Sequence, residues 1–372
     1  MLPTLSYLTD IHFGPGKAAA VSELTRDMAI RRPMIVTDAG LIGAGVIDRL
    51  RVESATIYDG VLTNPTEAQV LEAVATYREA GCDGIIAVGG GSSLDLAKCA
   101  GLLIGHEPPL RQYAILEGGV SRIRDRIPKW IAVPTTAGSG SEVGRAALAT
   151  LETGEKLGFL SPYLLPAAAI CDPELTVSMP PWVTAGTGMD AISHCVETFC
   201  SPRWNPAADA LALDGFLRGM SSLRSAFGNG ADIGARSEMM VCSLMGGLAF
   251  QKSLGAVHSL SHPLGGLQSV RLHHGTLNGL FLPVVLEFNT NACKEKLDAL
   301  AAGIGLSSGA DLPDAFRSLL EDLGLPLRLG DLGVTDADVV TMAPRAAADH
   351  CTPTNPRPLD EAACLELYRR VL

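Results

Sequence analysis

The first half of the chain alternates the signals of strands and helices. Four short apolar runs predict strands, at residues 34–38, 55–58, 84–88 and 130–133. A helix is predicted over 66–80, where Thr66 and Gln69 can form a capping box. Gly81 then supplies a stop signal. Because helical segments separate the strands, and the run at 84–88 carries no charge, we expect a mostly parallel sheet covered on both faces.

The second half of the chain has a different pattern. Strand-like runs largely vanish after residues 172–175, and helical segments follow at roughly 187–200, 207–225, 234–252 and 276–290. We therefore predict two domains. The first is an α/β domain with a mostly parallel, Rossmann-like sheet over residues 1–176, and the second is an all-α domain over residues 177–372.

Composition and charge narrow the classes of partner. Of the 372 residues, 47% are hydrophobic and 19% are charged, which argues against disorder. A net charge of −11 without a long run of Lys or Arg makes nucleic acids and anionic membranes poor partners. The N-terminal segment lacks the pattern of a signal peptide, and no apolar run approaches the roughly 20 residues that span a bilayer. Nine dispersed cysteines without a CxxC pair are typical of reduced thiols, so we expect a cytoplasmic protein.

A glycine-rich segment at 88–98 joins a predicted strand to a predicted helix. Three consecutive glycines, at 89–91, allow the backbone to approach a pyrophosphate closely, and the N-terminus of the following helix offers free N–H groups. The alternative is a tight turn without a ligand. We favour phosphate binding, because three glycines exceed what a turn needs.

A second loop, at 134–142, also follows a predicted strand and is rich in hydroxyls and glycines. It suits hydrogen bonds to a ribose, an amide or a phosphate, although a polar surface loop would have the same composition. Asp38 ends its strand and could accept hydrogen bonds from both adenosine ribose hydroxyls. Its carboxylate would repel a 2′-phosphate, which favours NAD over NADP. The alternative for Asp38 is an ordinary turn residue.

Four of the eight histidines lie between residues 255 and 275. His258 and His262 are spaced i,i+4, so one helical turn places both rings on one face. Neutral imidazole is a common metal ligand, and such a pair can converge on one ion or one substrate. The alternative is two half-buried histidines at a helix end near Pro263.

A second pair of ligand types lies upstream, where Asp190 and His194 are again spaced i,i+4. The alternatives are a capping box made by Thr187 and Asp190 and a helix-surface role for His194. Two predicted helices therefore each carry a pair of possible metal ligands, and the histidines at 273–274 add a third source of imidazole. Chance alone rarely gives so many possible ligands. One carboxylate and three imidazoles would form a mixed site for Zn²⁺ or Fe²⁺.

Taken together, the motifs resemble those of the iron-containing (group III) alcohol dehydrogenases along nearly the whole chain. They are GGGSSLDLAK at 89–98, PTTAGSGSEV at 134–143, DPELT at 172–176, TGMDAISHCVE at 187–197, GAVHSLSHPLG at 255–265, HHGTLN at 273–278 and TNPR at 354–357. Within that family the chain is most similar to the 4-hydroxybutyrate dehydrogenase branch, through EGGVSRI at 117–123, KLGFLSPYLLP at 156–166 and DHCTPTNP at 349–356.

The resemblance implies a dehydroquinate synthase-like architecture, in which the α/β domain binds NAD and the helical domain carries the metal and the catalytic groups. It implies the divalent-metal ligands Asp190, His194, His258 and His274, with His273 as a neighbour, and His262 as a proton relay. It also implies a homodimer. The cofactor-binding positions carried over are Asp38, Asn64, Gly90, Gly91, Ser92, Asp95, Thr135, Thr136, Ser141, Val143, Lys156 and Leu175.

The expected activity is oxidation of 4-hydroxybutyrate to succinic semialdehyde, and the reverse, by hydride transfer. The cations nearest the motifs, Arg145, Lys252 and Arg271, are candidates for meeting the substrate carboxylate, with Arg145 first because it directly follows the second loop. An ordinary surface arginine is the alternative. Other readings are a broader primary alcohol or diol dehydrogenase, a glycerol dehydrogenase, a maleylacetate-reductase-like enzyme, a transhydrogenase, a dehydroquinate-synthase-like lyase and a non-enzymatic binder of metal or nucleotide.

Overall fold

The computed structural model describes residues 9–267 and 269–372, which form two compact units. The α/β unit comprises residues 9–136 and 140–178, and the helical unit comprises residues 137–139 and the described part of 179–372. The short segment 137–139, inside the second glycine-rich loop, therefore clusters with the helices. Part of the segment on which we based the absence of a signal peptide, residues 1–8, lies outside the described chain.

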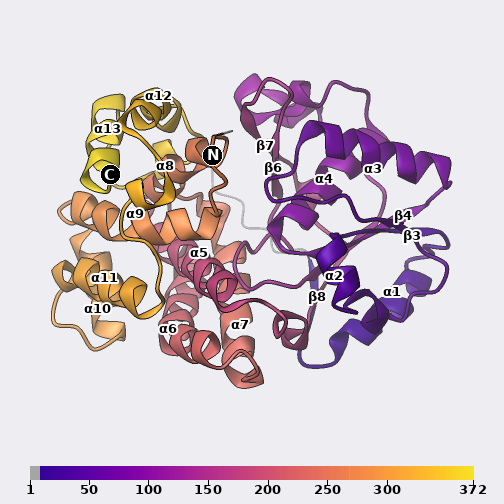
Figure 1. Cartoon of the computed structure of the whole chain (residues 1–372), viewed down its shortest axis with the longest axis horizontal. Helices are drawn as coiled ribbons and strands as arrows, with labels where there is room; N and C mark the ends of the chain where they lie inside the picture. The colour runs from indigo at the N-terminus through magenta and orange to yellow at the C-terminus, as the bar shows by residue number, and fades with distance from the viewer. Residues whose placement is uncertain (1–8, 268) are drawn as a thin grey trace. The chain divides into compact units, whose positions relative to one another are not determined.

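The α/β unit, drawn in indigo to magenta in Figure 1, is built on one parallel sheet of six strands in the order β1-β8-β5-β4-β2-β3. These strands are β1 (Asp10–Phe13), β2 (Pro33–Val36), β3 (Thr56–Tyr58), β4 (Gly84–Gly89), β5 (Trp130–Pro134) and β8 (Ala168–Cys171). β6 (Ala146–Thr150) and β7 (Lys156–Leu160) form a separate antiparallel hairpin, which the apolar pattern did not predict.

Four strands of this sheet, β2, β4, β5 and β8, are buried along their whole length beneath the helices of the same unit. These helices are α1 (Val21–Asp27), α2 (Ala39–Gly43), α3 (Glu67–Glu79) and α4 (Gly91–Gly105). The capping box of Thr66 and Gln69 is present at the start of α3, as predicted. Val21 and Leu50 pack with strand residues such as Ile86 in one core cluster, and all three side chains are fully buried.

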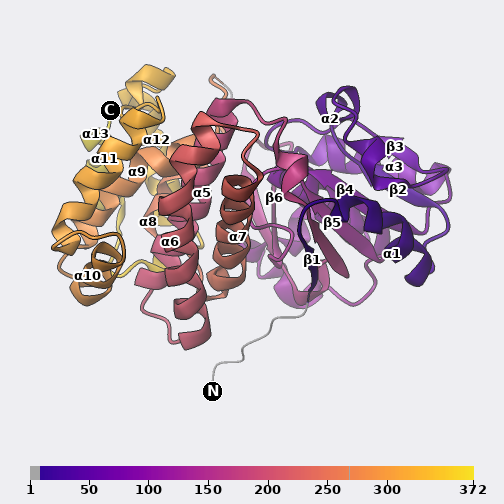
Figure 2. The same ribbon diagram turned by 90° about the horizontal axis from the view of Figure 1, so that it is seen from below.

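The second unit contains only helices among its described residues, so the predicted fold class is confirmed. They are α5 (Pro181–Cys200), α6 (Pro206–Gly228), α7 (Ile233–Ala249), α8 (Ala256–Leu264), α9 (His274–Asn289), α10 (Lys294–Gly303), α11 (Leu312–Asp322), α12 (Asp336–Ala347) and α13 (Glu361–Arg370). Figure 2 shows α5, α6 and α7 side by side, and the three helices contact one another.

The central helix α5 begins at Pro181, earlier than the periodicity indicated. Thr187 and Asp190 consequently lie in its interior, and the alternative capping box at this place is wrong. From Thr184 to Cys200 every residue of α5 is buried, because α6, α7 and α9 pack around it. Polar side chains on such a helix need partners inside the protein.

No single helix of the described chain is long and apolar enough to cross a membrane. One pair of helical segments, Ile233–Lys252 and Ala256–Leu264, passes the test of length and composition together, but the two are bent by 102° at their junction.

Candidate functional site

Three histidines surround one carboxylate oxygen in the helical unit. Asp190 and His194 lie one turn apart on α5, and His258 lies on α8. The Nε2 atoms of His194 and His258 each lie 3.7 Å from Oδ1 of Asp190. His274, the first residue of α9, places its Nε2 3.8 Å from the same oxygen. The structure thus places the three histidines that the resemblance implies as metal ligands around Asp190. The ligand atoms of Asp190, His194 and His258 also lie within 4.8 Å of one another.

The side-chain amide of Asn278 lies among these groups, one turn after His274 on α9. Its Nδ2 donates to Oδ1 of Asp190 at 2.7 Å and lies 3.1 Å from Nε2 of both His258 and His274. One carboxylate oxygen and two imidazole nitrogens therefore surround the positively polarised N–H₂ group of Asn278. A cation would be favoured at such a place for the same electrostatic reason.

Burial and charge together set the protonation of these residues. Burial lowers the pKa of His194 to about 4, although Asp190 opposes the shift. Burial acts in the same direction on His258, but the carboxylates of Glu197 and Asp190 outweigh it and raise its pKa to about 9. For Asp190 burial would raise the pKa, and the neighbouring histidines, with His194 foremost, lower it well below its ordinary value. Asp190 is thus held as a carboxylate.

Close packing of α9 against α5 places His274 near Asp190. A Cβ atom on Gly275 would lie 2.1 Å from the backbone oxygen of Gly186. Only glycine allows the two backbones to approach so closely, because no side chain separates them. The glycine that follows His274 therefore determines where this imidazole lies.

His262 lies next to these residues and has a carboxylate partner of its own. Its Nδ1 is 3.0 Å from Oδ2 of Asp349, and its ring is stacked on His274 and on His350. His262, Asp349, His350 and Cys351 form a second group whose possible ligand atoms lie within 4.8 Å of one another. Burial lowers the pKa of His262 to about 4 against the opposing charge of Asp349. A neutral ring with one nitrogen fixed by a carboxylate can accept or pass on a proton at the other.

His273 has a different environment from His274. It is the N-cap residue of α9, where its Nδ1 accepts the backbone N–H of Thr276 at 3.3 Å. Its ring meets Trp182 edge-on, and burial lowers its pKa. Its hydrogen bond is thus directed at the helix start and not at Asp190.

The predicted cofactor residues of the first loop gather around the start of α4. Gly90 is the N-cap of this helix, and Ser92 accepts the backbone N–H of Asn64 at 3.3 Å. Lys156 donates to the side-chain oxygen of Asn64 at 2.8 Å. A Cβ atom on Gly89, where φ is +149°, would lie 2.2 Å from the hydroxyl of Ser93. The backbone before α4 can thus turn sharply and leave its N–H groups accessible to an anion.

Two of the predicted cofactor residues, Asp95 and Ser141, are engaged inside the α/β unit. The carboxylate of Asp95 accepts the hydroxyl of Ser141 at 2.7 Å and the backbone N–H of Leu148 at 3.1 Å. The buried ammonium of Lys98 donates to the carbonyls of Ser141, Gly144 and Ala146. This network fastens the second loop to α4.

The remaining cofactor candidates are spread over the same unit. Thr135 donates its backbone N–H to Gly89, and Thr136 faces Gly90, where a Cβ atom would lie 3.2 Å from its methyl carbon. Asp38 is the N-cap of α2 and accepts the N–H of Leu41 at 3.0 Å. Gly91 opens α4, and the two apolar candidates, Val143 and Leu175, are buried, with Leu175 part of the core cluster.

The three candidate cations differ in their surroundings. Lys252 is fully buried and forms an ion pair with Asp209. Arg145 is half-buried and Arg271 is exposed. Neither guanidinium takes part in the ion pairs that arginines form within the described residues.

Three residues of the site were not predicted from the sequence: Glu197, Asn278 and Asp349. Glu197 lies seven positions after Asp190, on the same helical face, and this spacing was a usable signal. Asn278 and Asp349 lay within the quoted motifs, but only the fold shows which histidines they contact.

Comparisons with known proteins identify the relatives of this chain. A family model described as iron-containing alcohol dehydrogenase matches residues 9–173, and its C-terminal counterpart matches residues 184–372. The chain is 48% identical to the 4-hydroxybutyrate dehydrogenase of Cupriavidus necator over 98% of both chains.

Two solved structures resemble the chain over its full length. A 1,3-propanediol oxidoreductase is 35% identical, with a TM-score of 0.92 and 100% of both chains covered. A sulfoacetaldehyde reductase of Bifidobacterium kashiwanohense in complex with NAD⁺ is 28% identical, with a TM-score of 0.90, covering 100% of this chain and 99% of that one.

Proposed function

The chain belongs to the iron-containing alcohol dehydrogenase family, and from this premise we propose that it is a metal-dependent, NAD-linked dehydrogenase. Its proposed reaction is the oxidation of 4-hydroxybutyrate to succinic semialdehyde and the reverse reduction. The convergence of three imidazoles on the carboxylate of Asp190 carries the proposal of a metal enzyme, and the 48% identity to a 4-hydroxybutyrate dehydrogenase supports the substrate.

The donor atoms fit a divalent metal. Bonds of about 2.0–2.2 Å to one ion hold neighbouring ligand atoms roughly 3.4–3.8 Å apart at tetrahedral or slightly wider angles. The three Nε2 atoms lie 3.7–3.8 Å from Oδ1 of Asp190. Asp190, His194, His258 and His274 would hold Fe²⁺ or Zn²⁺, which both accept oxygen and imidazole ligands. When bound, such a metal supplies Lewis-acid stabilisation of negative charge on the substrate oxygen.

The residues around the metal ligands have complementary roles in this proposal. His262 would pass the proton of the alcohol onward, with Asp349 fixing its orientation through Nδ1. The N-terminus of α4 and the residues Asn64, Ser92 and Lys156 would hold the pyrophosphate of NAD. Asp38 would select NAD over NADP by charge.

The substrate carboxylate requires a cation, for which we propose Arg145. The carbonyls of the residues on either side of it, Gly144 and Ala146, are both held by Lys98. The backbone around Arg145 is therefore fixed, and its guanidinium is not among those that form ion pairs within the described residues. Lys252 suits the role less, because Asp209 neutralises it.

We also propose a homodimer and a reducing, cytoplasmic location. The first rests on the family resemblance. The second is supported by the cysteines, which are all free thiols in the structure.

The function is tested by following NADH absorbance after Fe²⁺ or Zn²⁺ has been restored to the enzyme. The substrates to compare are 4-hydroxybutyrate, 1-butanol, 1,3-propanediol and glycerol. We expect kcat/KM for 4-hydroxybutyrate to be well above that for 1-butanol. Equal or higher values for the uncharged alcohols would instead assign a broader alcohol or diol dehydrogenase. Turnover between two substrates without free NADH would assign a transhydrogenase.

A further inference from the structure

Glu197 occupies a special place on α5. It follows Asp190 and His194 at the i+7 position of the same helical face. Its carboxylate is nevertheless directed at α8. One oxygen, Oε1, accepts the backbone N–H of Val257 at 2.6 Å, and the other, Oε2, lies 2.5 Å from Nδ1 of His258. The carboxylate of Glu197 therefore contacts both the backbone of α8 and the side chain of His258 on that helix.

The two nitrogens of His258 face opposite partners. Nδ1 meets Glu197, whereas Nε2 faces Oδ1 of Asp190 at 3.7 Å and the amide of Asn278. A neutral imidazole that donates Nδ1–H to a carboxylate must carry its lone pair on Nε2. That lone pair points at the place where the other proposed ligands converge. A carboxylate behind a ligating imidazole also increases its basicity.

We propose that Glu197 is a positioning residue for the metal centre, which fixes the tautomer and the ring orientation of His258 and strengthens it as a ligand. The inference rests on the proposed function and deepens it. Glu197 contacts no substrate or cofactor in this proposal, and it acts only through His258.

The surroundings of Glu197 make its charge effective. Its side chain is 5% exposed and that of His258 is 1% exposed. Among the ion pairs of the described residues, His258 is the only partner of Glu197. A carboxylate buried without a cation is costly, and in a dry environment its attraction for an imidazole N–H is screened little. The backbone N–H of Val257 and Nδ1 of His258 thus stabilise this charge together.

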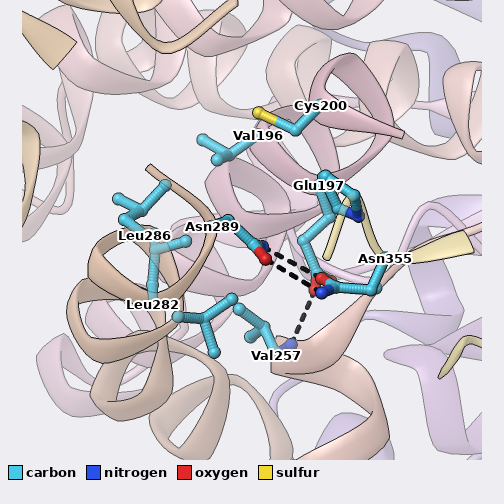
Figure 3. Close-up of a pocket in the computed structure, with 11 residues that line it drawn as sticks. Val196, Glu197, Cys200, Val257, Leu282, Leu286, Asn289 and Asn355 are labelled. Atoms are coloured by element: carbon cyan, nitrogen blue, oxygen red, sulfur yellow. Dashed lines mark hydrogen bonds between the residues drawn. The ribbon is translucent and has the colours of Figure 1, made fainter. Parts of the chain in front are cut away.

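The cavity in Figure 3 lies beside this carboxylate. It is lined by Glu197, Cys200, Leu286 and the amides of Asn289 and Asn355, and its volume is about 10 Å³. Such a space holds at most about one water molecule and cannot hold the substrate. The two amides are hydrogen-bonded to each other, and Asn355 also accepts the N–H of Ala256. The space beside Glu197 is therefore small and nearly filled.

Glu197 bonds to one of the three imidazoles that face Asp190. Both of its carboxylate oxygens are directed at α8, through Val257 and His258. His194 lies on α5 and His274 on α9, and the Nε2 atom of each faces Oδ1 of Asp190 at 3.7–3.8 Å. The effect of Glu197 should therefore be specific to the ligand from α8. A substitution at Glu197 should weaken one bond to the metal and leave the remaining three ligands in place.

The test compares Glu197→Gln and Glu197→Asp with the wild type. Glutamine keeps the size and can still accept from Val257, but its amide N–H₂ would face Nδ1 of His258. Nδ1 must then act as the acceptor, so the proton moves to Nε2 and blocks the lone pair that a metal needs. We expect Zn²⁺ and Co²⁺ to bind roughly 10–100-fold more weakly. Aspartate keeps the charge and should restore part of the affinity.

Affinity is measured by competition with a chelator, and the visible spectrum of the Co²⁺ protein reports whether the ligand field has changed. Glu287→Gln is the matched control, because Glu287 lies on α9 in the same unit and pairs with surface arginines. It should leave affinity and spectrum unchanged. Circular dichroism of the metal-free variants verifies folding. If the glutamine variant does not fold, the aspartate variant is tested alone, and it must show weakened metal binding and an altered Co²⁺ spectrum.

The outcomes separate the two proposals. A wild type that binds no divalent metal would overturn the proposed function. A wild type that binds metal, with a folded Glu197→Gln variant of equal affinity and identical Co²⁺ spectrum, would overturn only the role of Glu197.

Discussion

Nε2 of His274 lies 3.8 Å from Oδ1 of Asp190, on helices α9 and α5 that are distant in sequence. Its neighbour His273 instead caps the start of α9 through Thr276. The sequence offers two adjacent imidazoles, and the fold gives them different partners. One histidine faces the carboxylate on α5, and the other secures the helix that presents it.

Replacing these two histidines separately distinguishes their roles. We expect His274→Ala to lower Zn²⁺ affinity by more than about 100-fold, because loss of a ligand should exceed the roughly 10–100-fold cost of losing an outer partner. His273→Ala should keep most of the metal and lose a cap worth about 1 kcal/mol of stability. The metal content of each variant is measured after gel filtration, and a titration with a chelator gives its Zn²⁺ affinity. Retention of metal by His274→Ala with its loss from His273→Ala would reverse the assignment.

The close approach of α9 to α5 should be as important for metal binding as the ligand side chains. A Cβ atom on Gly275 would lie 2.1 Å from a backbone oxygen of Gly186, whereas one on Gly279 would meet the side chains of Leu320 and Met189 at 3.0–3.3 Å. We therefore expect Gly275→Ala to destabilise the helical unit by about 3 kcal/mol and to weaken metal binding. Gly279→Ala should cost about 1 kcal/mol or less, because flexible side chains can move and alanine favours a helix. Urea unfolding of both variants measures the difference in unfolding free energy. Equal losses would contradict the proposed role of the close contact between α9 and α5 at Gly275.

Local patterns explain how much of this architecture was predictable. The capping box at Thr66 and the charge-free run of β4 depend on neighbouring residues, so they could be recognised in the sequence. The i,i+4 pair of Asp190 and His194 is local too. The pairing of β1 with β8 joins residues far apart in the chain, and no short-range signal encodes it.

The unpredicted part of the site follows the same rule. The contact of Glu197 with His258 exists only because α8 packs against α5, and that of His262 with Asp349 joins α8 to the segment after α12. The start of α5 was placed too late because Thr187 resembles a cap, although Pro181 at the first turn begins the helix. Packing partners, unlike periodicity, require the three-dimensional fold.

Cofactor preference should depend on the charge of Asp38. Its side chain also caps α2 by accepting the N–H of Leu41. Removing the side chain would therefore disturb both the helix cap and the cofactor preference. The substitution Asp38→Asn should keep the cap, because asparagine is an equally good N-cap residue, while the charge is lost. We expect the ratio of kcat/KM for NADP to that for NAD to rise about tenfold, because a carboxylate near a 2′-phosphate costs roughly 1–4 kcal/mol. An unchanged ratio would remove Asp38 from the cofactor site.

Stability of the α/β unit should depend on pH through Glu142. Burial raises the pKa of this residue from its ordinary value of 4.5 to about 7, although Lys98 opposes the shift. The folded state thus holds a proton that the unfolded chain has already lost, so stability falls as pH rises from about 4.5 to 7. The loss is about 3 kcal/mol, since a tenfold change in proton affinity is worth about 1.4 kcal/mol.

Glu142→Gln should abolish this dependence, because glutamine does not titrate. Relative to the wild type, the variant should gain about 3 kcal/mol in unfolding free energy between pH 4.5 and 7. Urea unfolding of both proteins at several pH values measures it. Parallel pH profiles for the two proteins would show that Glu142 is ionised at the same pH in the folded and unfolded states.

Selection of a carboxylate substrate should depend on Arg145. Lys98 holds the carbonyls on either side of it, so its backbone is fixed and little ordering is needed when an anion binds. A hydrogen bond to a charged group is worth about 1.5–3 kcal/mol, and we therefore expect Arg145→Ala to raise KM for 4-hydroxybutyrate roughly 10–100-fold. KM for 1-butanol should change less than about twofold, because that substrate has no charge to lose. Arg271→Ala is the comparison variant, because Arg271 is the rival candidate, an exposed arginine in the helical unit. A selective loss in Arg271→Ala, with none in Arg145→Ala, would transfer the role to Arg271, and equal losses on both substrates would mean that Arg145 supports the loop and does not recognise the substrate.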